Sequence, residues 1–301
     1  MPTQRRAAQV TLACLIALVA PGAACSANTS EPPLVVSDAI DSLIGEVHLH
    51  AYADGSHPAA LFVAAPLPVS GSNGDDLVDL DPPIVAREGP CALHTQPTCA
   101  PACGGASLCL RTNTCVPIAP LSSVDDGPVV VSGSRTLPSL GLRFSRPDAR
   151  YVSDPAPGPP LFAGGETLRI DGGVGDYTFT ATLLAPDAVV VTRPDLTRDL
   201  HFPVDGPFVV EWMRAQSLPM TITLTASTVG GGGAGFIVCV VADTGSLEVP
   251  ASLLRGLPSP PRDLFFNIER RDLQLAHTRR RGLGVIVHAG SATSKNGRDS
   301  G

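Results

Sequence analysis

The chain has 301 residues, with 21 Lys and Arg against 28 Asp and Glu, and a net charge of −7. This acidic balance argues against nucleic acid as a partner, because phosphate binding needs a positive face. Gly and Pro contribute 30 residues each without a collagen-like period, which favours many turns and therefore many short strands.

The first 24 residues have the layout of an export signal. Arg5 and Arg6 give a positive start, an uncharged apolar run follows at residues 7–20, and Pro21 and Gly22 end it. The run is shorter than the roughly 20 residues that a membrane-spanning helix needs. We predict that residues 1–24 are removed, which leaves 19 basic against 28 acidic residues and a net charge of −9.

Gly22, Ala23 and Ala24 stand directly before Cys25, and this arrangement resembles the lipobox of bacterial lipoproteins. The resemblance implies that Cys25 becomes a lipidated N-terminus that attaches the protein to a membrane. Gly22 departs from the usual Leu or Val, so ordinary cleavage that leaves Cys25 as a thiol is the alternative. Residues 25–44 begin with small polar residues and Pro, and we interpret them as a flexible tether.

Residues 45–150 are interpreted as a smaller N-terminal β lobe. In its first strand Val47 and Leu49 share one face, while Glu46, His48 and His50 alternate on the other. A His-x-His pair on a strand can ligate zinc, so His48 and His50 are candidate metal ligands. The alternative is a pair of ordinary surface histidines, because the sequence assures no third ligand.

Five cysteines lie in an insert at residues 91–115 of this lobe. An exported chain lives in an oxidising compartment, so we expect disulfides, and six cysteines allow 15 pairings. At least one cysteine of the insert must then pair outside it, with Cys239 or Cys25, or stay free. A zinc site made by Cys91, His94, Cys99 and Cys103 is the alternative. The predicted disulfide cysteines are Cys91, Cys99, Cys103, Cys109, Cys115 and Cys239.

The Pro-rich residues 151–160 are interpreted as a joint, and residues 161–290 as a β-sandwich. Alternating patterns place Phe179, Ala181 and Leu183 on one face of a strand, and Met220, Ile222 and Leu224 on one face of another. The only tryptophan, Trp212, is interpreted as a core anchor. Residues 291–301 are expected to be a disordered tail.

Asp243, Thr244 and Gly245 reproduce the Asp-Thr-Gly of pepsin-like proteases, in which two aspartates share a proton and activate water. A second such motif is absent from the sequence, so a single chain cannot build the dyad. The same three residues between two apolar strands also make a hairpin turn, with Gly in the left-handed region. Asp243 is therefore a candidate catalytic residue, but we favour the interpretation that it belongs to a turn.

The segments FIVCVVADTGSLEVPASLL, LFAGGETLRI, ATLLAPDAVVVTRPDL and FVVEWM resemble bacterial surface lipoproteins of uncharacterised function that have immunoglobulin-like bodies. The resemblance covers about 130 residues with loose motifs, and it implies a localisation and a fold but no activity.

The predicted fold is all-β, with an antiparallel, immunoglobulin-like β-sandwich as the C-terminal lobe. We predict a lipid-anchored, non-catalytic protein of a bacterial outer membrane or cell surface that needs no cofactor and binds a protein or glycan through its loops. The alternatives are an exported hydrolase and a metal-binding envelope protein.

Overall fold

The structure is a computed structural model that describes residues 40–52, 60–63, 83–95, 99–100, 107–111, 114–117, 127–135, 139–145, 150–153, 162–203, 205–229 and 233–300. Within these ranges the chain forms eighteen strands, one short helix α1 (Ala251–Leu254) and one 3₁₀ turn η1 (Gly175–Tyr177). The all-β prediction is therefore confirmed.

Thirteen strands join in one sheet, and all of its pairs are antiparallel except β1 with β18, which run parallel. The sheet is consistent with a β-sandwich because further strands cover one of its faces. In spatial order its members are β11 (Phe179–Leu184), β10 (Thr167–Gly172), β7 (Val129–Ser132), β8 (Ser139–Ser145), β9 (Arg150–Ser153), β2 (Ala60–Val63), β1 (Ile40–Tyr52), β18 (Gly282–Asp299), β17 (Arg262–His277), β14 (Met220–Thr228), β15 (Ala234–Val241), β4 (Cys91–Thr95) and β3 (Ile84–Glu88).

The sheet does not follow the predicted division at residues 151–160. β1 pairs with β18, and β4 pairs with β15, so strands from both sides of the proposed joint are neighbours in one sheet. The alternating patterns identify strands and their buried faces, but they carry no information about which strand lies beside which. The immunoglobulin-like assignment stays a prediction.

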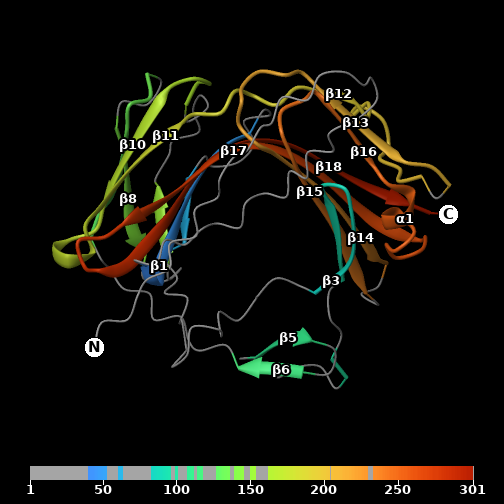
Figure 1. The fold of residues 1–301 in the computed structure, drawn as a ribbon, viewed down its shortest axis with the longest axis horizontal. Helices are drawn as coiled ribbons and strands as arrows, with labels where there is room; N and C mark the ends of the chain where they lie inside the picture. The colour runs from blue at the N-terminus through green and yellow to red at the C-terminus, as the bar shows by residue number, and fades with distance from the viewer. Residues whose placement is uncertain are drawn as a thin grey trace, which may run out of the picture.

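Two apolar cores lie along the sheet, and the long hairpin β17–β18 contributes to both (Figure 1). In the rolled half, made of β1, β2, β7–β11 and the adjoining ends of β17 and β18, the core contains Leu49, Leu142 and Val287. An isolated bridge between Phe179 and Thr278 joins the edge strand β11 back to the hairpin. The sheet therefore curls over this core.

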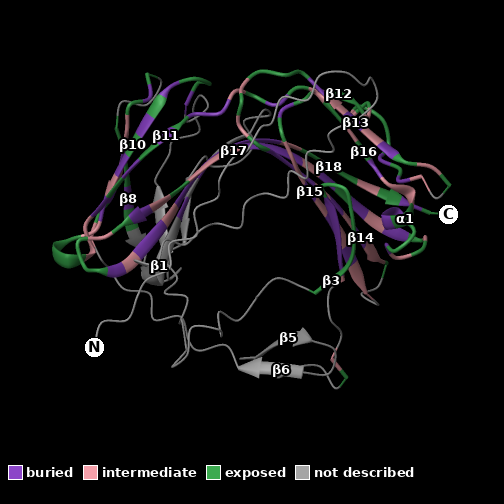
Figure 2. Cartoon of the chain, in the orientation of Figure 1, coloured by how far each residue is buried: buried purple, intermediate pink, exposed green. Residues whose placement is uncertain are grey.

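In the sandwich half, β12 (Val191–Arg193), β13 (Phe208–Trp212) and β16 (Ser246–Val249) form a second sheet over β14, β15 and β17. Phe208, Val210 and Trp212 are buried between the layers, which confirms Trp212 as a core residue. Figure 2 shows that buried residues follow the strands of both halves. A separate hairpin is formed by β5 (Ser107–Arg111) and β6 (Thr114–Pro117).

Both cores lie on the same face of the β17–β18 hairpin. Ile268, in the sandwich core, pairs with Thr293 of β18. Val287, in the rolled core, lies an even number of positions from Thr293 on the same strand, so both point to the same face. Glu269 and His288 therefore belong to the opposite face. Two different chemical environments result, one on each side of a single pair of strands.

The chain is ordered further toward both ends than the sequence indicates. β1 begins at Ile40, within the predicted tether at residues 25–44, and β18 continues to Asp299, through most of the predicted tail at residues 291–301. The polar residues after Ala292 look like a tail, but those at 293–299 lie in the strand that pairs with β17. Backbone pairing is independent of side-chain polarity, so hydrophobic alternation cannot predict it.

Candidate functional site

The Asp243-Thr244-Gly245 motif lies in the connection between β15 and β16. Gly245 has a φ of +90°, and a Cβ atom at this position would approach the Arg214 side chain to 2.8 Å. The carbonyl of Gly245 accepts a hydrogen bond from the N–H of Trp212 at 3.0 Å. A glycine is required here by both its backbone conformation and the space beside it. The geometry is that of a tight turn, but the predicted hairpin is wrong, because β15 and β16 belong to different sheets.

The Asp243 carboxylate is buried and accepts hydrogen bonds at both oxygens. The indole Nε1 of Trp212 donates to Oδ1 at 2.6 Å. The backbone N–H groups of Ala215 and Gln216 donate to Oδ2 at 3.1 and 3.2 Å. These donors come from β13 and the residues that follow it, so Asp243 attaches that segment to the end of β15.

Arg270, on β17, is completely buried and forms an ion pair with Asp243, with 3.0 Å between Nη2 and Oδ2. Its Nε also donates to Oδ2 at 3.2 Å. The remaining donors reach three backbone carbonyls, those of Asp187, Ala188 and Met213, at 2.9 to 3.3 Å. All five N–H groups of the guanidinium thus have acceptors, which is the condition under which a buried charge is tolerated.

The surroundings of Asp243 keep the carboxylate ionised. Burial raises its pKa, but hydrogen bonds from Ala215, Trp212 and Gln216 and the charge of Arg270 outweigh burial, so the pKa lies below the ordinary value. A pepsin-like dyad instead places a second carboxylate beside the first. The partners of Asp243 among the described residues are an indole, two amides and a guanidinium. This arrangement suits a structural anchor and leaves Asp243 without a proton to transfer.

Arg270 was not predicted as the partner of Asp243. A signal was present: Leu264, Phe266 and Ile268 are buried at alternate positions of β17, and Arg270 continues that series. An arginine at a core position predicts a buried acidic partner. The identity of that partner depends on the order of the strands in the sheet, and the pattern of buried residues along one strand does not reveal that order.

Cys91 and Cys239 form a disulfide between β4 and β15. The two cysteines are directly opposite in the antiparallel pair and lie 148 residues apart in the sequence. Both are buried in the sandwich core. The sequence left open whether one cysteine of the insert pairs with Cys239, pairs with Cys25 or stays free. The structure pairs Cys91 with Cys239, which links an N-terminal strand to a C-terminal one.

Cys99 is also disulfide-bonded, so the alternative zinc site loses the thiolates of both Cys91 and Cys99. His94, its proposed nitrogen ligand, stacks on Phe236 with ring centroids 4.8 Å apart. Cys109 and Cys115 are opposite each other in the β5–β6 hairpin. Cys103 lies outside the described residues, and three bridges in total stay a prediction.

His48 and His50 lie on β1, and the register with β18 places His48 beside His288 and His50 beside Gly290. Nε2 of His288 is 3.3 Å from Oε1 of Glu269, and both residues are buried. The side chains of His48 and His50 lie outside the description. Among the side chains that are described, no three His, Cys, Asp or Glu residues gather as a metal site.

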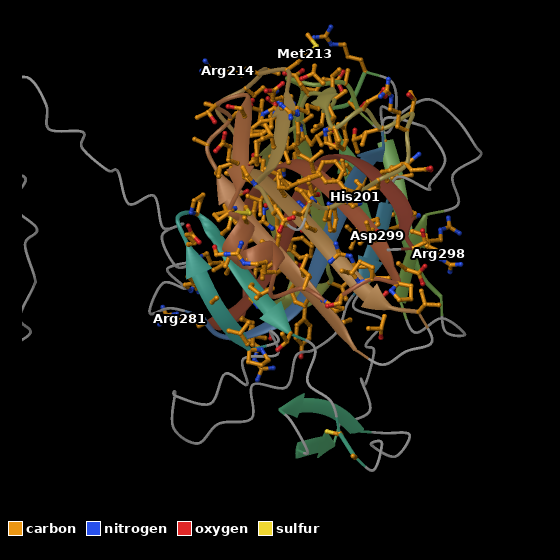
Figure 3. All side chains as sticks on the ribbon, turned by 90° about the vertical axis from the view of Figure 1, so that its right-hand side faces the viewer. His201, Met213, Arg214, Arg281, Arg298 and Asp299 are labelled. Carbon is orange, nitrogen blue, oxygen red and sulfur yellow. A yellow bond between two sulfur atoms is a disulfide. The ribbon has the colours of Figure 1, made fainter. Side chains whose placement is uncertain are left out.

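Two further buried carboxylates act as anchors. Asp299 pairs with the buried Arg262 at 3.2 Å and lies 3.6 Å from Nδ1 of the more exposed His201, and Figure 3 shows His201 and Asp299 close together. Glu166 accepts hydrogen bonds from the N–H groups of Ala163 and Arg135 at 3.0 and 3.1 Å. These two amides lower the pKa of Glu166 although burial raises it.

The predicted export signal at residues 1–24 and the predicted lipidation site Cys25 lie outside the described residues. Within the described part, no helix is long and apolar enough to cross a membrane. No family model, curated protein or solved structure matches the chain.

Proposed function

We propose that this protein is exported to a bacterial cell envelope, is anchored there through lipid on Cys25, and acts without catalysis by binding a protein or glycan. Its β framework would hold the binding loops away from the membrane on the segment after Cys25. Two kinds of observation support it: the leader and lipobox pattern of the sequence, and the covalent and ionic links within the folded chain.

The Cys91–Cys239 disulfide is the observation that carries the export part of the proposal. Structural disulfides persist in oxidising compartments and are rare in the reducing cytosol. This one joins directly opposed residues inside a core, so it belongs to the framework and not to a catalytic redox pair. A leader with a positive start and an apolar run supports the same compartment.

The surroundings of Asp243 support a non-catalytic role. The one motif in the sequence that matches an enzyme family is occupied by fixed internal donors and by the Arg270 charge. A hydrolytic aspartate needs an accessible oxygen for water and a partner that shares its proton. The carboxylate of Asp243 instead stabilises the junction between the two layers of the sandwich half.

One end of the sandwich half offers a surface suited to a ligand. Met213 and Val190 are exposed large apolar residues, and the N–H of Met213 donates to the carbonyl of Val190 at 2.9 Å. Figure 3 shows Met213 and Arg214 together at that end, away from His201 and Asp299. An apolar side chain next to a cation is a common composition for a protein-binding surface.

The anchoring is tested by expressing the full-length chain in a bacterium fed with a labelled fatty acid. We expect label on the protein and recovery in the membrane fraction. Cys25→Ala should remove both, while Cys14→Ala, which changes a cysteine inside the predicted leader, should leave both intact. Label that persists in Cys25→Ala, or a cytosolic protein with an uncleaved leader, would contradict the proposal.

A further inference from the structure

The turn between β17 and β18 contains three consecutive arginines, Arg279, Arg280 and Arg281, and all three are exposed. The N–H of Arg279 donates to the carbonyl of Thr178 at 3.1 Å, and the N–H of Arg280 donates to the carbonyl of Asp176 at 2.8 Å. These bonds attach the turn to the η1 segment beside it. The arginines therefore stand on a fixed backbone at one end of the molecule (Figure 1).

We call residues 174–178 and 279–281 together the arginine tip. Among the described residues, Arg279 and Arg281 form no ion pair, and Nη1 of Arg280 donates to the phenol oxygen of Tyr177 at 3.4 Å. Asp176 is the one acidic residue of the tip, so three positive charges against one negative charge give it a net charge of +2. The predicted mature chain has a charge of −9, which leaves −11 on the remainder. The tip is thus a positive end on a negative protein.

The predicted tether enters the fold beside the arginine tip. Ile40, the first residue of β1, pairs with Gly282, which directly follows Arg281. From there β1 runs parallel to β18, away from the turn. Ile40 follows Cys25 by 15 residues, and a segment of that length spans at most about 50 Å. A lipid on Cys25 would therefore keep the tip within reach of the membrane, at a high effective concentration.

We propose that the arginine tip binds the phosphate groups of an anionic lipid surface and holds this end of the anchored protein toward the membrane. The proposal rests on the lipid attachment proposed above for Cys25. Basic residues close to a membrane are attracted by its negative surface potential, whereas the negative remainder of the chain is repelled, so both forces favour one orientation.

The side chains and the fold suit this orientation. Val174 is an exposed apolar residue and Tyr177 is partly exposed, and apolar, tyrosine and arginine side chains together are typical of the boundary between water and lipid. Figure 3 shows Arg281 well away from Met213 and Arg214. A tip bound to the membrane would therefore leave the surface proposed for ligand binding exposed.

The test uses residues 25–301 with their disulfides intact and one synthetic hexadecyl chain attached to the Cys25 thiol. A single acyl chain binds membranes only marginally, so a contribution from the tip is measurable. Co-sedimentation should show binding to vesicles of phosphatidylcholine with phosphatidylglycerol that is roughly 10- to 100-fold tighter than to phosphatidylcholine alone. The triple variant Arg279→Gln, Arg280→Gln, Arg281→Gln should lose this preference. Added NaCl should weaken it in the wild type, because salt screens the attraction.

The matched control removes three exposed arginines from the sandwich half, Arg193→Gln, Arg198→Gln and Arg255→Gln. It has the same net charge as the tip variant and should keep the preference for anionic vesicles. Equal binding of the wild type to both kinds of vesicle would overturn the proposal, as would a preference that both triple variants lose equally.

Circular dichroism establishes that each variant is folded. If the tip variant does not fold, the wild type decides the outcome, because binding to anionic vesicles that added NaCl leaves unchanged would overturn the proposal. The acyl chain is attached chemically, so the result is independent of lipidation in the cell. Absence of fatty-acid label on Cys25 would contradict the proposed function, whereas loss of the lipid preference would contradict the role of the arginine tip.

Discussion

Glu269 and Arg270 are neighbours in the sequence, yet they belong to opposite faces of β17 and to opposite kinds of environment. Arg270 faces the sandwich core, where all five of its N–H groups meet fixed internal acceptors. Glu269 lies on the other face beside His288, near the register positions of His48 and His50. Arg270 therefore belongs to the ion-pair network of the sandwich core, whereas Glu269 belongs to a second buried polar pair on the other face.

The comparison shows that burial alone does not identify a functional residue. Asp243 has the motif of an enzyme, is buried and has a lowered pKa, but every contact it makes stabilises the fold. A buried charged residue inside an enzyme-like motif can therefore be wholly structural.

The largest expected effect is on stability when the core-facing charge is removed. Arg270→Met leaves the Asp243 carboxylate buried without its counter-ion and should lower the free energy of unfolding by about 3–5 kcal/mol. Arg298→Met, which breaks the exposed pair with Asp263 on the same hairpin, should lower it by less than about 1 kcal/mol. Urea unfolding of both variants checks this, and equal losses would contradict the structural role of Arg270.

Removal of the covalent link between β4 and β15 should be the next largest effect. The double variant Cys91→Ala, Cys239→Ala should lose about 2–4 kcal/mol, because the disulfide restricts a long loop of the unfolded chain. Thermal unfolding without reductant measures it. Excess reductant should lower the stability of the wild type by at least as much, because it also breaks the bridge at Cys99. A double variant as stable as the oxidised wild type would contradict the assignment.

Trp212→Phe removes one of the hydrogen-bond donors to the Asp243 carboxylate. The ring stays apolar and keeps most of its contacts in the core, but the hydrogen bond from Nε1 to Oδ1 is lost. A hydrogen bond to a charged group contributes about 1.5–3 kcal/mol, and the loss of stability should fall in that range. In Arg270→Met the same substitution should cost a different amount, because the two residues share one carboxylate.

The pH dependence of stability should distinguish Asp243 from an exposed carboxylate. Its folded pKa lies below the unfolded value, so its contribution is present above about pH 4 and disappears as the pH falls through the folded pKa. Asp243→Asn should therefore be less stable at neutral pH and lose less on acidification. Asp263→Asn, in an exposed pair with Arg298, should change the profile only slightly.

The sequence predicted the strands and their buried faces but not their order. Alternation at Phe208, Val210 and Trp212 and at Met220, Ile222 and Leu224 is a local property, and the structure confirms it. The pairings of β1 with β18 and of Cys91 with Cys239 join distant segments, and no local pattern contains them. The Asp243–Arg270 pair and the His48–His288 register both depend on that order, so neither was predictable.

Peptide mapping of the native mature protein by mass spectrometry, without reduction, tests the central claim most directly. The account predicts an N-terminal peptide that begins at an acylated Cys25 and a cross-linked pair of peptides that contains Cys91 and Cys239. An intact leader together with alkylatable thiols at Cys91 and Cys239 would contradict it.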